Sequence, residues 1–347
     1  MSAARFAREL GRASVLLLAL LAGCATHSAS NNRAPLDQAA NVSGKKGAAA
    51  APTLLTFDWP QELDADVVAL REEFTVKGDS EHTSRLEARF HLHSVRDGDR
   101  YALSFSNLEM KLDDAPVPDG AQPAMIGQIT GLVPNYDIAA NGDFIGQRDF
   151  QRLQSFAERS YIEQNDRLPP DQRPPPRDAE KAMKSGSSRD VLQLEAARTW
   201  GALVSMWAGV TMTEGKPLNN DATVTVPVIN MPVTMHSTFE LVRQEACSNG
   251  DRKRECVRLR ATSRPDHDQL AAARQKLRES SGEPVEPLSI TGNLQVEDRY
   301  ELLTDPKTLK PRWAEWVRGA DVGSEEQGSE LLQSRQSTRT RMIFVYR

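Results

Sequence analysis

The chain has 347 residues, with 43 lysines and arginines against 48 aspartates and glutamates, which gives a formal net charge of −5 at pH 7. This mildly acidic balance argues against a nucleic-acid-binding protein, whose surface needs a basic stripe. The length allows one large or two small domains that bury a substantial core.

The first 23 residues have the three parts of an export signal. Arg5, Arg8 and Arg12 form a positive region, an apolar run follows over 15–21, and the small residues Ala22 and Gly23 lead directly into Cys24. The apolar run is much shorter than the roughly 20 residues that a membrane-spanning helix needs. Leu21-Ala22-Gly23-Cys24 resembles the lipobox of bacterial lipoproteins, in which the cysteine sulfur is lipidated and the chain is cleaved before it.

The resemblance implies that Cys24 carries acyl chains, palmitate among them, and anchors the protein to a membrane of the cell envelope. Two or more acyl chains hold a protein stably at a bilayer. Ala25 follows the cysteine, which in Gram-negative lipoproteins favours the outer membrane, facing the periplasm or the cell surface. Residues 24–52 are rich in Ala, Ser, Asn and Gly and lack periodicity, so we expect a disordered tether.

The folded region, 53–347, begins with a β pattern. Apolar and polar residues alternate over 86–93 and again over 101–105, with the turn Arg96-Asp97-Gly98-Asp99 between them, which predicts a hairpin with one buried face. A second hairpin is expected from 129–138 through Asn141-Gly142-Asp143, and it leads into a helix over 150–161.

A proline-rich break near 168–188 separates this part from a second helix, which begins near Ser187 and stops at Gly209. Its apolar face consists of Leu192, Ala196, Trp200, Leu203 and Trp207. Further strands are predicted over 223–228, 231–247, 288–303, 313–317 and 337–346, with a polar helix over 266–280.

Two cysteines remain after Cys24. Cys247 and Cys256 flank the turn signal Asn249-Gly250, and the sequence alternates on both sides of it. Export places the pair in an oxidising compartment, so we predict a disulfide between them.

The order of strands, helices and strands predicts an α+β fold, with a large, curved antiparallel sheet and one or two helices on its concave face. The segments Asn141–Ile145, Trp200–Trp207 and Tyr300–Thr308 give this layout a distributed likeness to the half-barrel cradle of the LolA/LolB-like superfamily of lipoprotein carriers. The resemblance implies an apolar ligand held between sheet and helix, where Trp200, Leu203 and Trp207 would contact it. The alternative is that these side chains simply form the core.

The sequence contains no standard catalytic motif, and we expect neither an enzyme nor a cofactor. His91 and His93 share one face of a strand and are weak candidates for a metal site, with His82 or Glu87 as a third ligand. The alternative is two solvated histidines.

The leading hypothesis is a membrane-anchored, non-enzymatic envelope lipoprotein that binds an apolar ligand or an envelope protein. A structural protein that docks a wall or surface partner, and a metal-dependent enzyme that uses His91 and His93, are the alternatives.

Overall fold

The computed structural model describes residues 51–77, 80–117, 132–151, 189–226, 231–247, 255–281, 294–322 and 334–347, together with the helical positions 155, 162 and 166. The lipobox with Cys24, most of the predicted tether, the turn Asn249-Gly250 and most of the predicted helix over 150–161 lie outside the described residues. In the part of the chain that is described, no helix is long and apolar enough to cross a membrane.

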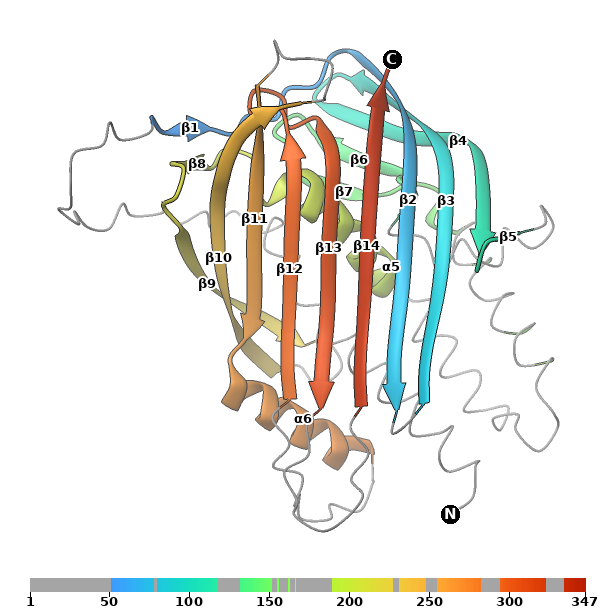
Figure 1. Cartoon of the computed structure of the whole chain (residues 1–347), viewed down its shortest axis with the longest axis vertical. Coiled ribbons are helices and arrows are strands. Elements are labelled where there is room, and N and C mark those ends of the chain that lie inside the picture. Colours follow the sequence, from blue (N-terminus) through green and yellow to red (C-terminus); the bar gives the residue numbers. More distant parts are fainter. Residues whose placement is uncertain are drawn as a thin grey trace.

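One antiparallel sheet of 12 strands organises the molecule (Figure 1). Its strands follow one another in the order β7 (Phe144–Gln147), β6 (Tyr136–Ala139), β4 (Arg100–Leu112), β3 (Ser80–Asp97), β2 (Glu62–Lys77), β14 (Ser334–Tyr346), β13 (Pro311–Val322), β12 (Leu294–Thr304), β11 (Glu255–Pro265), β10 (Met231–Ala246) and β9 (Leu218–Val226), and β5 (Ala115–Pro116) pairs with β4. Among the described strands, β7 and β9 do not pair with each other, so the sheet is not closed.

Two of the helices accompanying the sheet lie in the ranges that the structure describes without gaps. Helix α5 (Arg189–Trp200) continues into a π-helical turn (Gly201–Ser205) and lies behind the sheet in Figure 1. Helix α6 (His267–Ser281) lies at the lower end of β10 and β12. A separate two-stranded ribbon joins β1 (Thr53–Leu54) to β8 (Thr211–Met212). The predicted α+β fold dominated by a large antiparallel sheet is confirmed.

The alternation in the long strands separates the sheet into two faces. The face toward α5, here called the inner face, carries the hydrophobic core, because every second residue of β3 from Leu86 to Ser94 is buried. Neighbouring strands contribute residues of the same kind, including Ala65, Val67, Trp316, Met342 and Phe344. The opposite face, here called the outer face, carries the intervening residues.

The turn Asn141-Gly142-Asp143 packs into this core. Gly142 has a φ of 90°, a conformation that L side chains rarely adopt, and a Cβ built on it would lie 3.0 Å from the Phe57 ring. Its carbonyl accepts a hydrogen bond of 2.8 Å from the Trp200 indole. The predicted hairpin turn is therefore also part of the surface against which Trp200 packs.

Candidate functional site

The three residues that the sequence predicts as apolar-ligand contacts all lie in the core. Trp200, Leu203 and Trp207 are 2%, 5% and 0% exposed. The Trp207 indole donates to the carbonyl of Ala202 at 2.9 Å, and its ring meets Phe239 edge-on at 5.8 Å. The protein itself therefore supplies each indole with a hydrogen-bond acceptor for its N–H and with aromatic neighbours for its ring.

A buried ionic cluster lies beside these residues, between α5 and the inner face. Arg198, which is 1% exposed, donates to Glu195 at 2.9 Å, and Arg318 of β13 lies 3.6 Å from the other oxygen of the same carboxylate. Asp298 of β12 is also buried and accepts a bond of 3.2 Å from the Tyr300 hydroxyl. The cluster ties the helix to the sheet.

The pKa shifts of Glu195 and Tyr136 support this description of the cluster. Burial alone would raise the pKa of Glu195, but Arg318 and then Arg198 outweigh it, so that its pKa is lowered. Burial raises the pKa of Tyr136, and the neighbouring Glu195 carboxylate adds to the effect. Opposite charges thus keep the ionised forms in place, as expected of a structural ion pair.

This cluster was not predicted from the sequence, although a signal was present. Ala314 and Trp316 alternate along β13 as inward, buried residues, and Arg318 occupies the next inward position. A charged residue at an inward position of an alternating strand indicates a buried partner. On β12, Asp298 follows the buried Val296 in the same way.

His91 and His93 lie on the outer face, as predicted, and both contact one carboxylate. Asp64 Oδ1 is 3.0 Å from Nε2 of His91 and 2.8 Å from Nδ1 of His93, while Nδ1 of His91 is 3.1 Å from Asp66. Hydrogen bonding to His93 is the main cause that lowers the pKa of Asp64, and Arg347 is the main cause for Asp66. Because both aspartates lie on β2, strand pairing assembles this cluster.

The third metal ligands proposed from the sequence were wrong. His82 is nine residues from His91 on the same strand, about 30 Å away, and Glu87 pairs with Arg89 at 2.8 Å. Among the described residues, no group of three or more metal-ligating side chains is arranged to hold a metal ion.

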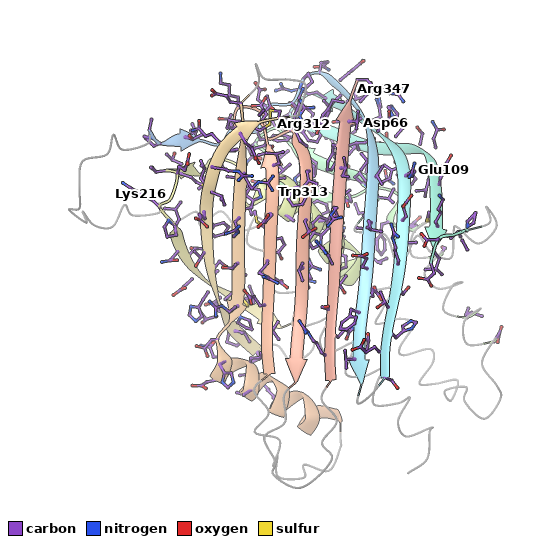
Figure 2. The ribbon with its side chains drawn as sticks, viewed as in Figure 1. Asp66, Glu109, Lys216, Arg312, Trp313 and Arg347 are labelled. Atoms are coloured by element: carbon purple, nitrogen blue, oxygen red, sulfur yellow. A yellow bond between two sulfur atoms is a disulfide. The ribbon has the colours of Figure 1, made fainter. Side chains whose placement is uncertain are left out.

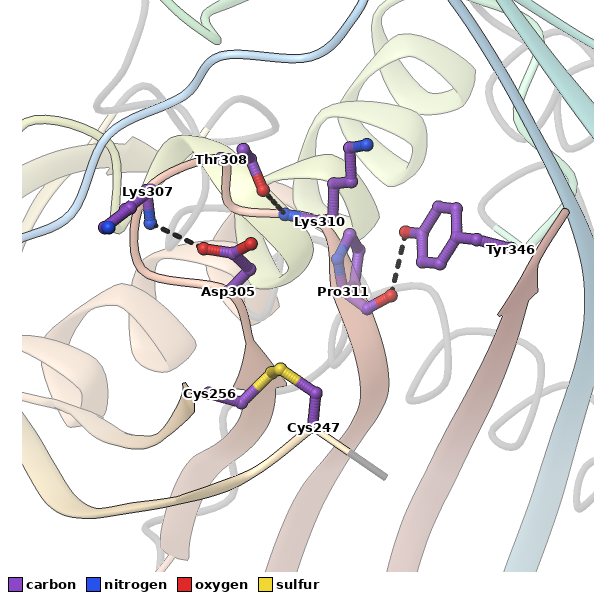
Figure 3. Close-up of a disulfide and its surroundings, with 8 residues drawn as sticks. All are labelled: Cys247, Cys256, Asp305, Lys307, Thr308, Lys310, Pro311 and Tyr346. Atoms are coloured by element: carbon purple, nitrogen blue, oxygen red, sulfur yellow. Dashed lines mark hydrogen bonds between the residues drawn. A yellow bond between two sulfur atoms is a disulfide. The ribbon is translucent and has the colours of Figure 1, made fainter. Parts of the chain in front are cut away.

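The disulfide is confirmed. Cys247 and Cys256 are joined with their Cα atoms 4.8 Å apart, next to the Asp305–Pro311 turn (Figure 3). The two residues are not direct cross-strand partners, since Cys256 pairs with Glu245 and Cys247 lies just beyond the end of β10. Both are buried, and the bond joins β10 and β11 near the ends that lie uppermost in Figure 1.

An apolar stripe crosses the outer face of the four central strands, near the end of the sheet at which β12 and β14 finish and β13 begins. Val68, Ile343, Trp313 and Leu303 are successive partners on β2, β14, β13 and β12, and we call them the Trp313 stripe. Ile343 is 44% exposed, and Val345, two residues further along β14, is 60% exposed. Figure 2 shows Trp313 on the face of the sheet opposite α5.

Charged side chains border this stripe. At one end, Arg258 lies 5.3 Å over the Trp313 ring, and at the other, Arg89 pairs with Val68. Below the stripe, Arg341 and Arg339 both bind Glu315, at 2.8 and 2.9 Å. An exposed apolar patch within a polar rim is typical of a protein-docking surface.

Comparisons with known proteins add little. No protein-family model and no curated protein matches the sequence. Among solved structures, the chain is similar to one described as "lipid-protein interactions in lipovitellin", with a TM-score of 0.40 and 9% identity over 83% of this chain and 25% of that one. The chain spans about a quarter of the length of that protein, and a likeness at this level does not imply a shared function.

Proposed function

We propose that this chain is a lipid-anchored lipoprotein of the bacterial cell envelope that acts, without catalysing a reaction, by binding a protein partner through the Trp313 stripe. The stripe itself carries the proposal, because Ile343 is exposed and Val68, Trp313 and Leu303 are only partly buried on the outer face. Sheet residues on a solvent-facing side are normally polar, and its two central members are an exposed isoleucine and a tryptophan.

Partner binding has better support than a half-barrel cradle for an apolar ligand. Trp200 and Trp207, which the sequence predicts as contacts of such a ligand, are at most 2% exposed and are hydrogen-bonded to the backbone. Binding at the Trp313 stripe leaves the core intact.

The lipobox supplies the proposed location. Lipid on Cys24 would hold the protein at the membrane, and Ala25 favours the outer membrane. A tether over 24–52 would have a root-mean-square reach of roughly 30 Å, so the folded part could turn its outer face toward a partner in the same envelope.

The test is site-specific photocrosslinking in intact cells. A photoreactive amino acid at position 343 should give one dominant protein adduct, while the same amino acid at position 145 should not. Ile145 is a matched control, because it is an exposed isoleucine at 55% on β7, away from the stripe. Equal, diffuse labelling from both positions would contradict the proposal.

A further inference from the structure

The register of the central strands arranges the outer face in cross-strand rows. The stripe belongs to the row Glu109–Arg89–Val68–Ile343–Trp313–Leu303–Arg258–Arg243. The next row is Lys111–Glu87–Leu70–Arg341–Glu315–Glu301–Arg260–Glu240, and the one after it is Arg85–Glu72–Arg339–Val317–Arg299–Thr262. Each row is read across the strands from β4 or β3 toward β10 or β11.

Two copies of this face could stack with many of their side chains matched, if the second copy is rotated about the line between β13 and β14. A twofold axis along that line, parallel to the strands, would place β14 of one copy on β13 of the other and β2 on β12. Ile343 would then face Trp313 of the second copy, and Val68 would face Leu303. Both apolar contacts would occur twice, as in any isologous interface.

Most charged residues of the next two rows would face a residue of opposite charge in the same superposition. Arg341 would face Glu315, and Glu72 would face Arg299. Further out, Glu87 would face Arg260, and the pairs Lys111–Glu240 and Glu109–Arg243 would also be of opposite sign. Three pairs are mismatched. Leu70 would face Glu301, and Arg339 would face Val317. Arg89 would face Arg258, but each of these already binds a carboxylate within its own chain, at 2.8 and 2.7 Å.

We infer that the partner of the Trp313 stripe is a second copy of this chain, stacked sheet to sheet in a twofold dimer. This inference rests on the proposed function and names the partner of the same surface. Packed sheets lie about 10 Å apart, and their twist rotates them by about 30°. The matched contacts are therefore those nearest the axis, on β2, β14, β13 and β12.

The size of the surface sets the strength of the dimer. From β4 to β10 there are seven strand spacings of about 4.8 Å, so the two longer rows are about 34 Å wide. Such a patch is at the small end of specific interfaces. The dimer is then weak in dilute solution and favoured when both copies are held on one membrane, where their effective concentration is high.

The first experiment is sedimentation-equilibrium analysis of the full chain carrying Cys24→Ala, so that no lipid drives association. A concentration-dependent monomer–dimer equilibrium is expected. Ile343→Glu should raise its dissociation constant roughly tenfold or more, because the charge enters the centre of the interface twice. Ile145→Glu should leave it unchanged, and circular dichroism should show that both variants are folded.

The second experiment tests the register by charge exchange. Glu72→Arg and Arg299→Glu should each weaken the dimer, since each places like charges face to face. The double variant Glu72→Arg/Arg299→Glu should restore it, which a non-specific association would not do. If the double variant instead forms a weaker dimer than either single variant, the proposed register is overturned.

The two proposals fail in different ways. A monomer at every concentration, with an adduct from position 343 to a different protein, would overturn the dimer and leave partner binding standing. A monomer that also gives no specific adduct from position 343 in cells would overturn both.

Discussion

A comparison of Trp207 with Trp313 gives the sharpest test of how closely side chains pack on each side of the sheet. Trp207 is fully buried on the inner face, whereas Trp313 lies on the outer face under Arg258. Replacing either with alanine removes the same atoms. If the side chains between α5 and the inner face are packed as a core, the two replacements should lower the free energy of unfolding by very different amounts.

The expected cost can be worked out from burial. A buried tryptophan hides about 200 Å² of surface, which at about 25 cal/mol per Å² is about 5 kcal/mol. The alanine side chain retains a part of this burial free energy. The carbonyl of Ala202 loses its hydrogen bond, which costs a further amount of about 1 kcal/mol. We expect Trp207→Ala to lower the free energy of unfolding by about 4 kcal/mol, within the usual range for such changes, and Trp313→Ala to lower it by about 1 kcal/mol or less.

The assay is urea denaturation of both variants followed by far-ultraviolet circular dichroism, with the slope against urea compared with that of the parent. A cost below about 1 kcal/mol for Trp207→Ala would refute the packed interface. It would instead indicate a space beneath the π-helical turn that tolerates loss of the ring, as a ligand-binding cradle would require.

Three other outcomes are expected. Replacing Cys247 and Cys256 with serine should lower the free energy of unfolding by roughly 2–3 kcal/mol in the loop-entropy model, and a reductant should then have no further effect on the variant. The pKa of Asp64 is lowered in the folded state, so its contribution to stability is present above its unfolded pKa of about 3.9 and lost as pH falls through the folded value. The stability difference between the parent and Asp64→Asn should therefore vanish in acid, and a difference that grows instead would contradict this assignment. Cys24→Ala should abolish incorporation of labelled palmitate and move the protein out of the membrane fraction; unchanged fractionation would rule out the lipid anchor.

Local patterns accounted for much of the fold. Alternation over 86–93 and 101–105 predicted β3 and β4, and the apolar face from Leu192 to Trp207 predicted α5, because these signals lie within one element. The cysteine pair was equally local, since a short hairpin brings both residues together. The predicted polar helix over 266–280 matches α6 to within one residue at each end.

The candidate surface could not be predicted in this way. The Trp313 stripe draws its members from β2, β12, β13 and β14, and the decisive neighbours Val68 and Ile343 are far apart in the sequence. Neither residue is unusual where it stands, since an apolar residue in a strand ordinarily indicates the core. Only the register shows that they share the solvent-facing side.

The pairing of β2 with β14 also bears on how the protein is made. These neighbours at the centre of the sheet are joined from Ala65–Tyr346 to Lys77–Ser334, and the side chain of Arg347 binds Asp66 across 281 positions. The flanking strands β2 and β13 keep open backbone edges until β14 enters between them. The residues of β14 must therefore be synthesised before the central part of the native sheet can assemble. Removal of the stretch 334–347 would split the sheet down its middle rather than trim its margin.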